Sequence, residues 1–180
     1  PWYGNGDGFV PDEIHEGSKL AWVAQNPGET EDQLGSPMIG RTGQLIMKDI
    51  GRFGFQREAC SWMNVLKCRW TGVDGKKSNF IPDTPSTAKA VAHCIQAHLH
   101  LPSPNVFALL GDLALHYMTG VQGIDSWRGS VWTPEGGVLA GRKVMALIHP
   151  AAIFRDLSWR AAHKQDFARV AREARSEAPS

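Results

Sequence analysis

Three polar sites lie within or directly after apolar runs, and their side chains suit the binding of a polar ring and the placing of water. They are Gln25-Asn26-Pro27-Gly28, Asn64 within an apolar run, and His149 before a proline. An asparagine amide offers both a donor and an acceptor, which matches the edge of a pyrimidine. Asn26 could orient a water, and a neutral His149 could donate to a developing anion. Each also has an ordinary structural interpretation, as a turn, a backbone-bonded amide or a loop histidine.

The elements that must position these residues follow from hydrophobic periodicity. The predicted strands are four short apolar runs: 19–25, 61–68, 106–110 and 144–148. The predicted helices are 42–53, 84–100, 112–118 and 159–175, with a small hairpin over 130–139. This alternation predicts a three-layer α/β/α fold with a central four-stranded, mainly parallel sheet. Ligands of such sheets bind outside the carboxyl ends of the strands, where Gln25, Asn64 and His149 all fall.

Composition is that of an ordinary globular protein, with 42% hydrophobic and 21% charged residues. We expect one domain over residues 1–180, with residues 1–18 as an N-terminal loop and 176–180 as a frayed tail. The sequence starts without Met inside a Gly-rich stretch, so we expect it to be trimmed upstream. No apolar run is long enough for a membrane helix. Three cysteines are an odd count, which favours a reducing, cytoplasmic setting, and we expect a monomer.

Charge is distributed unevenly although the formal net charge is only +1. Residues 1–40 are acidic, whereas residues 41–80 and 151–180 are basic. Two basic stretches could form one positive surface that suits nucleic acid, although solvated surface charge is the simpler alternative. The sequence has no Gly-rich dinucleotide fingerprint, no phosphate-binding loop of the Walker type and no Gly-x-Ser-x-Gly elbow. Nucleotide-cofactor enzymes and esterases of those types are therefore disfavoured.

Several segments, taken in chain order, carry a more specific signal. They are Ala24 to Asp32, Gly35 to Leu45, Asn64 to Arg69, Thr84 to Cys94, Ala108 to Gly111, Arg128-Gly129 and His149 to Ala152. Together they resemble the motifs of the uracil-DNA glycosylase superfamily, most of all its family 4, the iron–sulfur type. The first two are similar to Gly-Glu-Ala-Pro-Gly and Pro-Phe-Val-Gly-Arg-Ala-Gly-Gln-Leu, the third to Asn-Val-Val-Lys-Cys-Arg, and the last is the His-Pro motif. Each match is short, and their common order makes the resemblance specific.

The resemblance implies a base-excision DNA glycosylase that hydrolyses the N-glycosidic bond of uracil, or of a related deaminated or modified pyrimidine. The target base would be flipped out of the duplex into a pocket. Two residues would be catalytic: Asn26 would place the attacking water, and His149 would stabilise negative charge on the departing base. The residues implied to bind the base are Gln25, Met38 and Asn64. Those implied to contact DNA are Arg41, Ile153, Phe154 and Arg155.

The cysteines also fit the resemblance in part. Cys68 and Cys94 match two of the four ligands of the family's [4Fe–4S] cluster. The other two are expected in a Cys-x-x-Cys upstream of Pro1, and the cluster would form only if they are there. No metal is needed at the chemistry itself. Cys60 has no counterpart and is predicted to be a core thiol.

Three departures from the family pattern leave alternatives open. Gln25 replaces the family's Glu, Met38 replaces an aromatic residue that stacks on the base, and the segment between Cys68 and Cys94 is longer than usual. Asn26-Pro27-Gly28 is also similar to the mismatch-specific branch, which leaves the exact base open. One alternative is a DNA-binding relative without catalysis. Another is an unrelated α/β enzyme that hydrolyses free nucleotides.

Overall fold

A mostly parallel sheet lies at the centre of the computed structural model, which describes residues 8–71, 75–78, 81, 84–98 and 101–176. Its strand order is β2-β1-β5-β7-β6. The strands are β1 (Leu20–Ala24), β2 (Cys60–Asn64), β5 (Val106–Leu110), β7 (Val144–Leu147) and β6 (Val131–Trp132). The first four are parallel, and β6 pairs antiparallel with β7. The chain moves from β1 to β2 on one side and later to β5 on the other, so β1 lies at the topological switch point.

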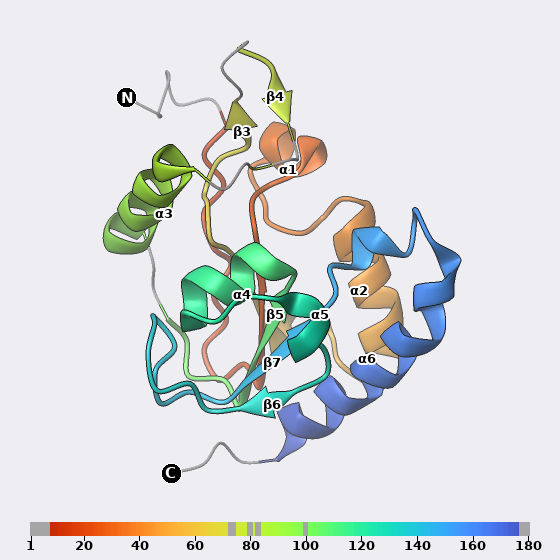
Figure 1. Ribbon diagram of the computed structural model, residues 1–180. Coiled ribbons are helices and arrows are strands. Elements are labelled where there is room, and N and C mark those ends of the chain that lie inside the picture. The colour runs from red at the N-terminus through yellow and green to blue at the C-terminus, as the bar shows by residue number, and fades with distance from the viewer. Residues whose placement is uncertain (1–7, 72–74, 79–80, 82–83, 99–100, 177–180) are drawn as a thin grey trace.

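Helices cover both faces of this sheet, which makes three layers (Figure 1). One face carries α2 (Arg41–Gly51) and α6 (Arg160–Arg175), which contact each other. The opposite face carries α3 (Pro85–His98) and α4 (Asp112–Thr119). Shorter helices are α1 (Glu29–Leu34), α5 (Ile124–Trp127) and the single turns η1 (Arg57–Ala59), η2 (Pro150–Ala152) and η3 (Leu157–Trp159). No helix among the described residues is long and apolar enough to cross a membrane.

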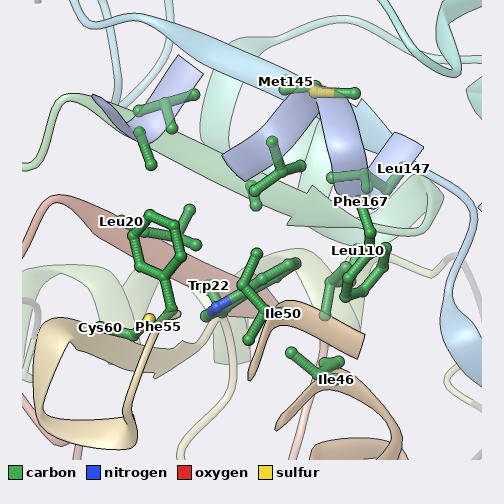
Figure 2. Close-up of a cluster of buried hydrophobic side chains, with 14 of the residues drawn as sticks. Leu20, Trp22, Ile46, Ile50, Phe55, Cys60, Leu110, Met145, Leu147 and Phe167 are labelled. Carbon is green, nitrogen blue, oxygen red and sulfur yellow. The ribbon is translucent and has the colours of Figure 1, made fainter. Parts of the chain in front are cut away.

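Alternation along the strands divides the core into two clusters. Leu20 and Trp22 of β1 face α2 and α6, whereas Ala21 and Val23 face α3 and α4. All five residues of β1 are buried because both faces of a parallel sheet are covered. Trp22 stacks on Phe167 of α6 with ring centroids 5.1 Å apart, and Figure 2 shows this pair among the aliphatic side chains of the first cluster. The strands that position the site are therefore packed on both faces.

The predicted α/β class and parallel sheet are confirmed, and the expected count of four strands is wrong. A fifth strand, β6, lies at the edge of the sheet, where Val131–Trp132 pairs with β7. The sequence predicts that these residues form a small hairpin over 130–139, which the structure does not contain. A second sheet of two short strands, β3 (Trp70–Thr71) and β4 (Lys77–Ser78), lies outside the predicted elements. Both differences involve strands of two residues, which are too short for periodicity to reveal.

Three predicted segments reach residues outside the described part of the chain. The helix predicted over 84–100 is seen as α3, capped by Thr84, whose Oγ1 accepts a hydrogen bond from Thr87 N at 3.3 Å, and residues 99–100 are not described. Within the predicted N-terminal loop, residues 1–7 are not described. Residues 8–18 form two isolated antiparallel bridges: Glu13 pairs with Trp62 of β2, and Phe9 pairs with Cys68 beyond the end of that strand. Of the predicted tail, only Ser176 is described.

Candidate functional site

A pocket of about 680 Å³ opens at the carboxyl edge of the sheet. It gathers most of the residues that sequence analysis singled out, from segments far apart in the chain. Its lining includes Gln25, Asn26, Met38, Arg41, Asn64, His149, Phe154 and Arg155. The strand register explains this meeting, because Ala24 lies opposite Asn64 where β1 and β2 end. Parallel strands bring their carboxyl ends to one edge, as expected.

Asn64 is the deepest amide of the pocket, with only 2% of its surface exposed. It ends β2, and the two residues after it bind the end of β1: Val65 N donates to Ala24 O at 2.9 Å, and Leu66 N donates to Gln25 O at 2.8 Å. These bonds continue the ladder beyond the strand and fix Asn64 beside Gln25. A buried amide that is held in this way can present a donor and an acceptor to a ring edge.

Asn26 lies at the turn where β1 leaves the sheet. Its side-chain Nδ2 donates to the carbonyl of Pro27 at 3.0 Å, which fixes the orientation of the amide. An amide is too weak a base to take a proton from water, so a water bound here can be positioned but not deprotonated by Asn26.

His149 follows β7 and caps the single turn η2. Its Nδ1 accepts a hydrogen bond from Ala151 N at 3.2 Å. An acceptor nitrogen carries no proton, so the neutral ring carries its proton on Nε2. Burial and, to a smaller extent, the nearby charge of Arg155 together lower the pKa of His149 to about 4. At neutral pH the ring is therefore an uncharged N–H donor that lines the pocket.

Met38 forms part of the pocket wall in an unusual backbone conformation. It is the one non-glycine residue with positive φ in the described part of the chain, at 50°, and it is 4% exposed. Arg57 holds this turn, because Nη2 donates to Pro37 O at 2.7 Å and Nη1 donates to Met38 O at 3.3 Å. A bulky residue keeps such a conformation only where its surroundings impose it.

Glu31 lines the same wall and was missed by the sequence analysis. Its Oε1 accepts a hydrogen bond from Gly40 N at 2.7 Å, and a Cβ at Gly40 would lie 2.9 Å from this oxygen. A side chain at position 40 would therefore displace this carboxylate. Its sequence signal is weak, because it lies in a polar stretch between the predicted elements 19–25 and 42–53, which the structure folds in part into α1.

The rim of the pocket carries the cationic and aromatic residues expected to meet DNA. Arg41 and Arg155 are exposed, and Phe154 is 43% exposed with the Arg41 guanidinium 4.5 Å from its ring centroid. Ile153 does not belong to this group. It is 4% exposed and lines a small separate cavity beside His163, so the expected DNA contact by Ile153 is corrected to a core role.

Cys68 and Cys94 lie near each other. Burial raises the pKa of the Cys68 thiol, and the neighbouring Cys94 and Asp32 raise it further. Two thiolates are half of the set that a [4Fe–4S] cluster requires. Among the described residues no group of three or more His, Cys, Asp or Glu could hold a metal ion. These residues alone therefore do not complete a cluster site, and Cys60, buried in the first core cluster, is no third ligand.

Comparison with known proteins covers the part of the chain that forms the pocket. A family model, the Uracil DNA glycosylase superfamily, matches residues 11–174. A Type-4 uracil-DNA glycosylase of Thermotoga maritima is 30% identical over 161 residues, covering 88% of this chain and 78% of that protein. One of Archaeoglobus fulgidus is 28% identical over 169 residues, covering 90% and 80%. One of Pyrobaculum aerophilum is 27% identical, covering 81% and 73%.

Proposed function

Since this chain belongs to the uracil DNA glycosylase superfamily, we propose that it is a DNA glycosylase of base-excision repair that hydrolyses the N-glycosidic bond of uracil in DNA. One observation carries the proposal. A single pocket brings together a buried amide, a water-placing amide and a neutral histidine, from the ends of three parallel strands. A related deaminated or modified pyrimidine remains within the same chemistry.

Asn64 and the backbone at the end of β1 recognise the base. Asn64 pairs with the carbonyl and N–H of the pyrimidine edge, and the Gln25 backbone completes that contact. Met38 covers the face of the ring in place of an aromatic side chain, since a thioether packs well on π systems.

Bond cleavage leaves a cationic sugar and an anionic base, so a donor at the base oxygen lowers the barrier. His149 supplies this donor through Nε2–H, because its Nδ1 is occupied by Ala151 N. Asn26 holds the water that attacks the sugar. Replacing His149 by Ala removes the donor and should lower the excision rate by about 10²–10³.

The residues at the rim of the pocket bind the DNA around the flipped base. Arg41 and Arg155 neutralise phosphates, and Phe154 is placed to fill the gap that the flipped base leaves in the stack.

For the cofactor we propose that Cys68 and Cys94 are two of four [4Fe–4S] ligands, and that the cluster forms only if two further cysteines lie upstream of Pro1. No step of the reaction passes through this group. The test is iron content after reconstitution of the chain extended upstream of Pro1 by the expected Cys-x-x-Cys: Cys68→Ser and Cys94→Ser should each lose bound iron, and Cys60→Ser should keep it. Equal iron in all three variants would refute the assignment.

We further propose that residues 1–180 act as a single domain and as a monomer in the cytoplasm. Support comes from a family match that spans most of the chain and from the odd count of three cysteines, which suits a reducing compartment. Sedimentation of the purified protein tests the monomer.

The decisive experiment is a strand-nicking assay with a labelled oligonucleotide that holds one uracil, either single-stranded or paired, followed by alkali to cleave abasic sites. We expect a nick at the uracil that His149→Ala slows. Binding without any nick, unaffected by changes at Asn26 or His149, would favour the non-catalytic relative.

A further inference from the structure

Residues 9–15, here called the N-terminal strap, run antiparallel to β2, the outer strand of the sheet. Val10 N donates to Lys67 O at 2.7 Å, and Glu13 and Trp62 exchange backbone bonds of 2.9 and 2.8 Å. The strap therefore covers the edge of β2 and brings two neighbouring acids, Asp12 and Glu13, behind the base pocket.

Asp12 grips the backbone of Asn64. Its Oδ1 accepts from Asn64 N at 3.1 Å. Lys67 Nζ donates to both oxygens of Asp12 at 2.7 Å and to Asn64 O at 2.6 Å. The side chains of Lys67 and Asp12 are only 1% and 5% exposed. A buried ion pair adds little to the free energy of folding. Its hydrogen bonds nevertheless fix the position of the Asn64 backbone.

Glu13 grips the other wall of the pocket through Arg57. Arg57 Nη2 lies 2.6 Å from Glu13 Oε2, and Nε lies 3.0 Å from Oε1, so the guanidinium is held by both carboxylate oxygens. It also lies over the Trp62 ring at 4.7 Å. Held in this way, it directs its remaining donors to the carbonyls of Pro37 and Met38 and supports the positive-φ turn.

We propose that Asp12 and Glu13 are positioning residues of the base pocket: Asp12 with Lys67 fixes Asn64, and Glu13 through Arg57 fixes Met38. The strap thereby sets the spacing between the amide that reads the pyrimidine edge and the side chain that covers its face. The base-binding role of these residues rests on the proposed function. Their support of the pocket wall can be tested without any activity.

The first experiment is a cycle of variants with kinetics on uracil-containing DNA. Glu13→Gln keeps the side-chain size and removes the charge that holds Arg57. We expect KM to rise at least fivefold with kcat changed less than twofold, because contact with the ring face stabilises ground and transition states alike. In a Met38→Ala background the same change should have no further effect on KM.

The matched control is Glu16→Gln, an exposed acid next to the strap, which should leave KM unchanged. A Glu13 effect that persists in the Met38→Ala background, or that equals the Glu16→Gln effect, would overturn the inference. Asp12→Asn leaves Lys67 without its charge partner and risks the fold, so Glu13→Gln is the primary variant.

The second experiment needs no activity. Amide hydrogen exchange of residues 36–41 should speed up at least tenfold in Glu13→Gln, relative to α6 as an internal reference. Unchanged exchange there would overturn the inference even if uracil is excised. If the unaltered protein does not nick uracil DNA, the proposed function fails, and the exchange result alone decides whether the strap positions this wall.

Discussion

His149 shows how a single hydrogen bond sets the chemistry of a residue. The bond from Ala151 N to Nδ1 assigns the ring proton to Nε2, and burial keeps the ring neutral by lowering its pKa to about 4. A neutral donor does not lose its catalytic form anywhere between pH 5 and 8. An imidazolium would be fully formed only below the ordinary pKa of about 6.5.

The pH dependence of uracil excision follows from this assignment. We expect kcat/KM to be independent of His149 titration from pH 8 to about 5 and to fall as the pH approaches 4, where protonation of Nδ1 breaks its bond with Ala151 N. The profile should be measured with circular dichroism at each pH to verify folding. A rate that rises as the pH falls through 6.5 would instead identify a charged histidine as the donor.

Asn64 determines which base is accepted. Replacing it with Asp removes the amide donor and adds an acceptor, which suits the N4 amine of cytosine. Asn64→Asp should therefore lower uracil excision and create measurable cytosine excision, whereas Asn64→Ala should only lower the former. The assay is nicking of matched oligonucleotides with one uracil or one cytosine. An unchanged preference would remove Asn64 from the base-reading role.

At the scale of elements, the start of α2 and the turn before it are packed as one unit. A Cβ at Gly43 would lie 1.6 Å from the Met38 carbonyl oxygen. The first turn of α2 therefore lies so close to the pocket wall that only glycine fits at position 43 without a shift of the backbone. At the other end of α2, a Cβ at Gly51 would meet nothing within 4 Å. The two glycines of one helix thus have opposite roles.

Alanine at these two positions should act in opposite directions. Gly43→Ala should destabilise the fold by about 1–3 kcal/mol through overpacking and should also raise KM by displacing Met38. Gly51→Ala should stabilise it by roughly 0.5–1 kcal/mol, because alanine restricts the unfolded chain and suits a helix. Urea unfolding measures both values. Equal stability of the two variants would contradict the close approach.

For the whole molecule, two histidines with a lowered pKa couple stability to pH. Burial lowers the pKa of His149, and it lowers the pKa of His163 against the opposing effect of Asp49, whose Oδ2 lies 3.0 Å from Nε2. The unfolded chain takes up protons at these histidines before the folded one does. The contribution of these two histidines to the free energy of unfolding is therefore fully present above about pH 6.5, and it is lost as the pH falls toward 4.

The unfolding free energy should drop by about 2 kcal/mol from pH 7 to pH 5 on account of His149 alone. Denaturant unfolding at both pH values measures this drop. His149→Gln should remove most of it, and His93→Gln, which changes an exposed residue of α3, should not. An equal drop in all three proteins would show that other groups control the pH dependence.

The sequence by itself determined the α/β class, the approximate strands and the family resemblance. Those properties are written locally, in apolar periodicity and in short motifs such as Asn26-Pro27-Gly28 and His149-Pro150. It also placed the segment from Asn64 to Arg69 at the carboxyl end of the strand predicted over 61–68, and the structure ends that strand, β2, at Asn64 itself. Parallel topology made the meeting of the strand ends predictable.

Only the tertiary structure decided how the pocket is held. Glu13 and Arg57 lie 44 positions apart, and nothing local in either segment indicates that they meet. The burial of Ile153, the positive φ of Met38 and the fifth strand β6 likewise depend on neighbours distant in sequence. The physical reason is that side-chain type and spacing fix which face of an element is apolar, whereas the identity of the partner across that face is set by the packing of the whole chain.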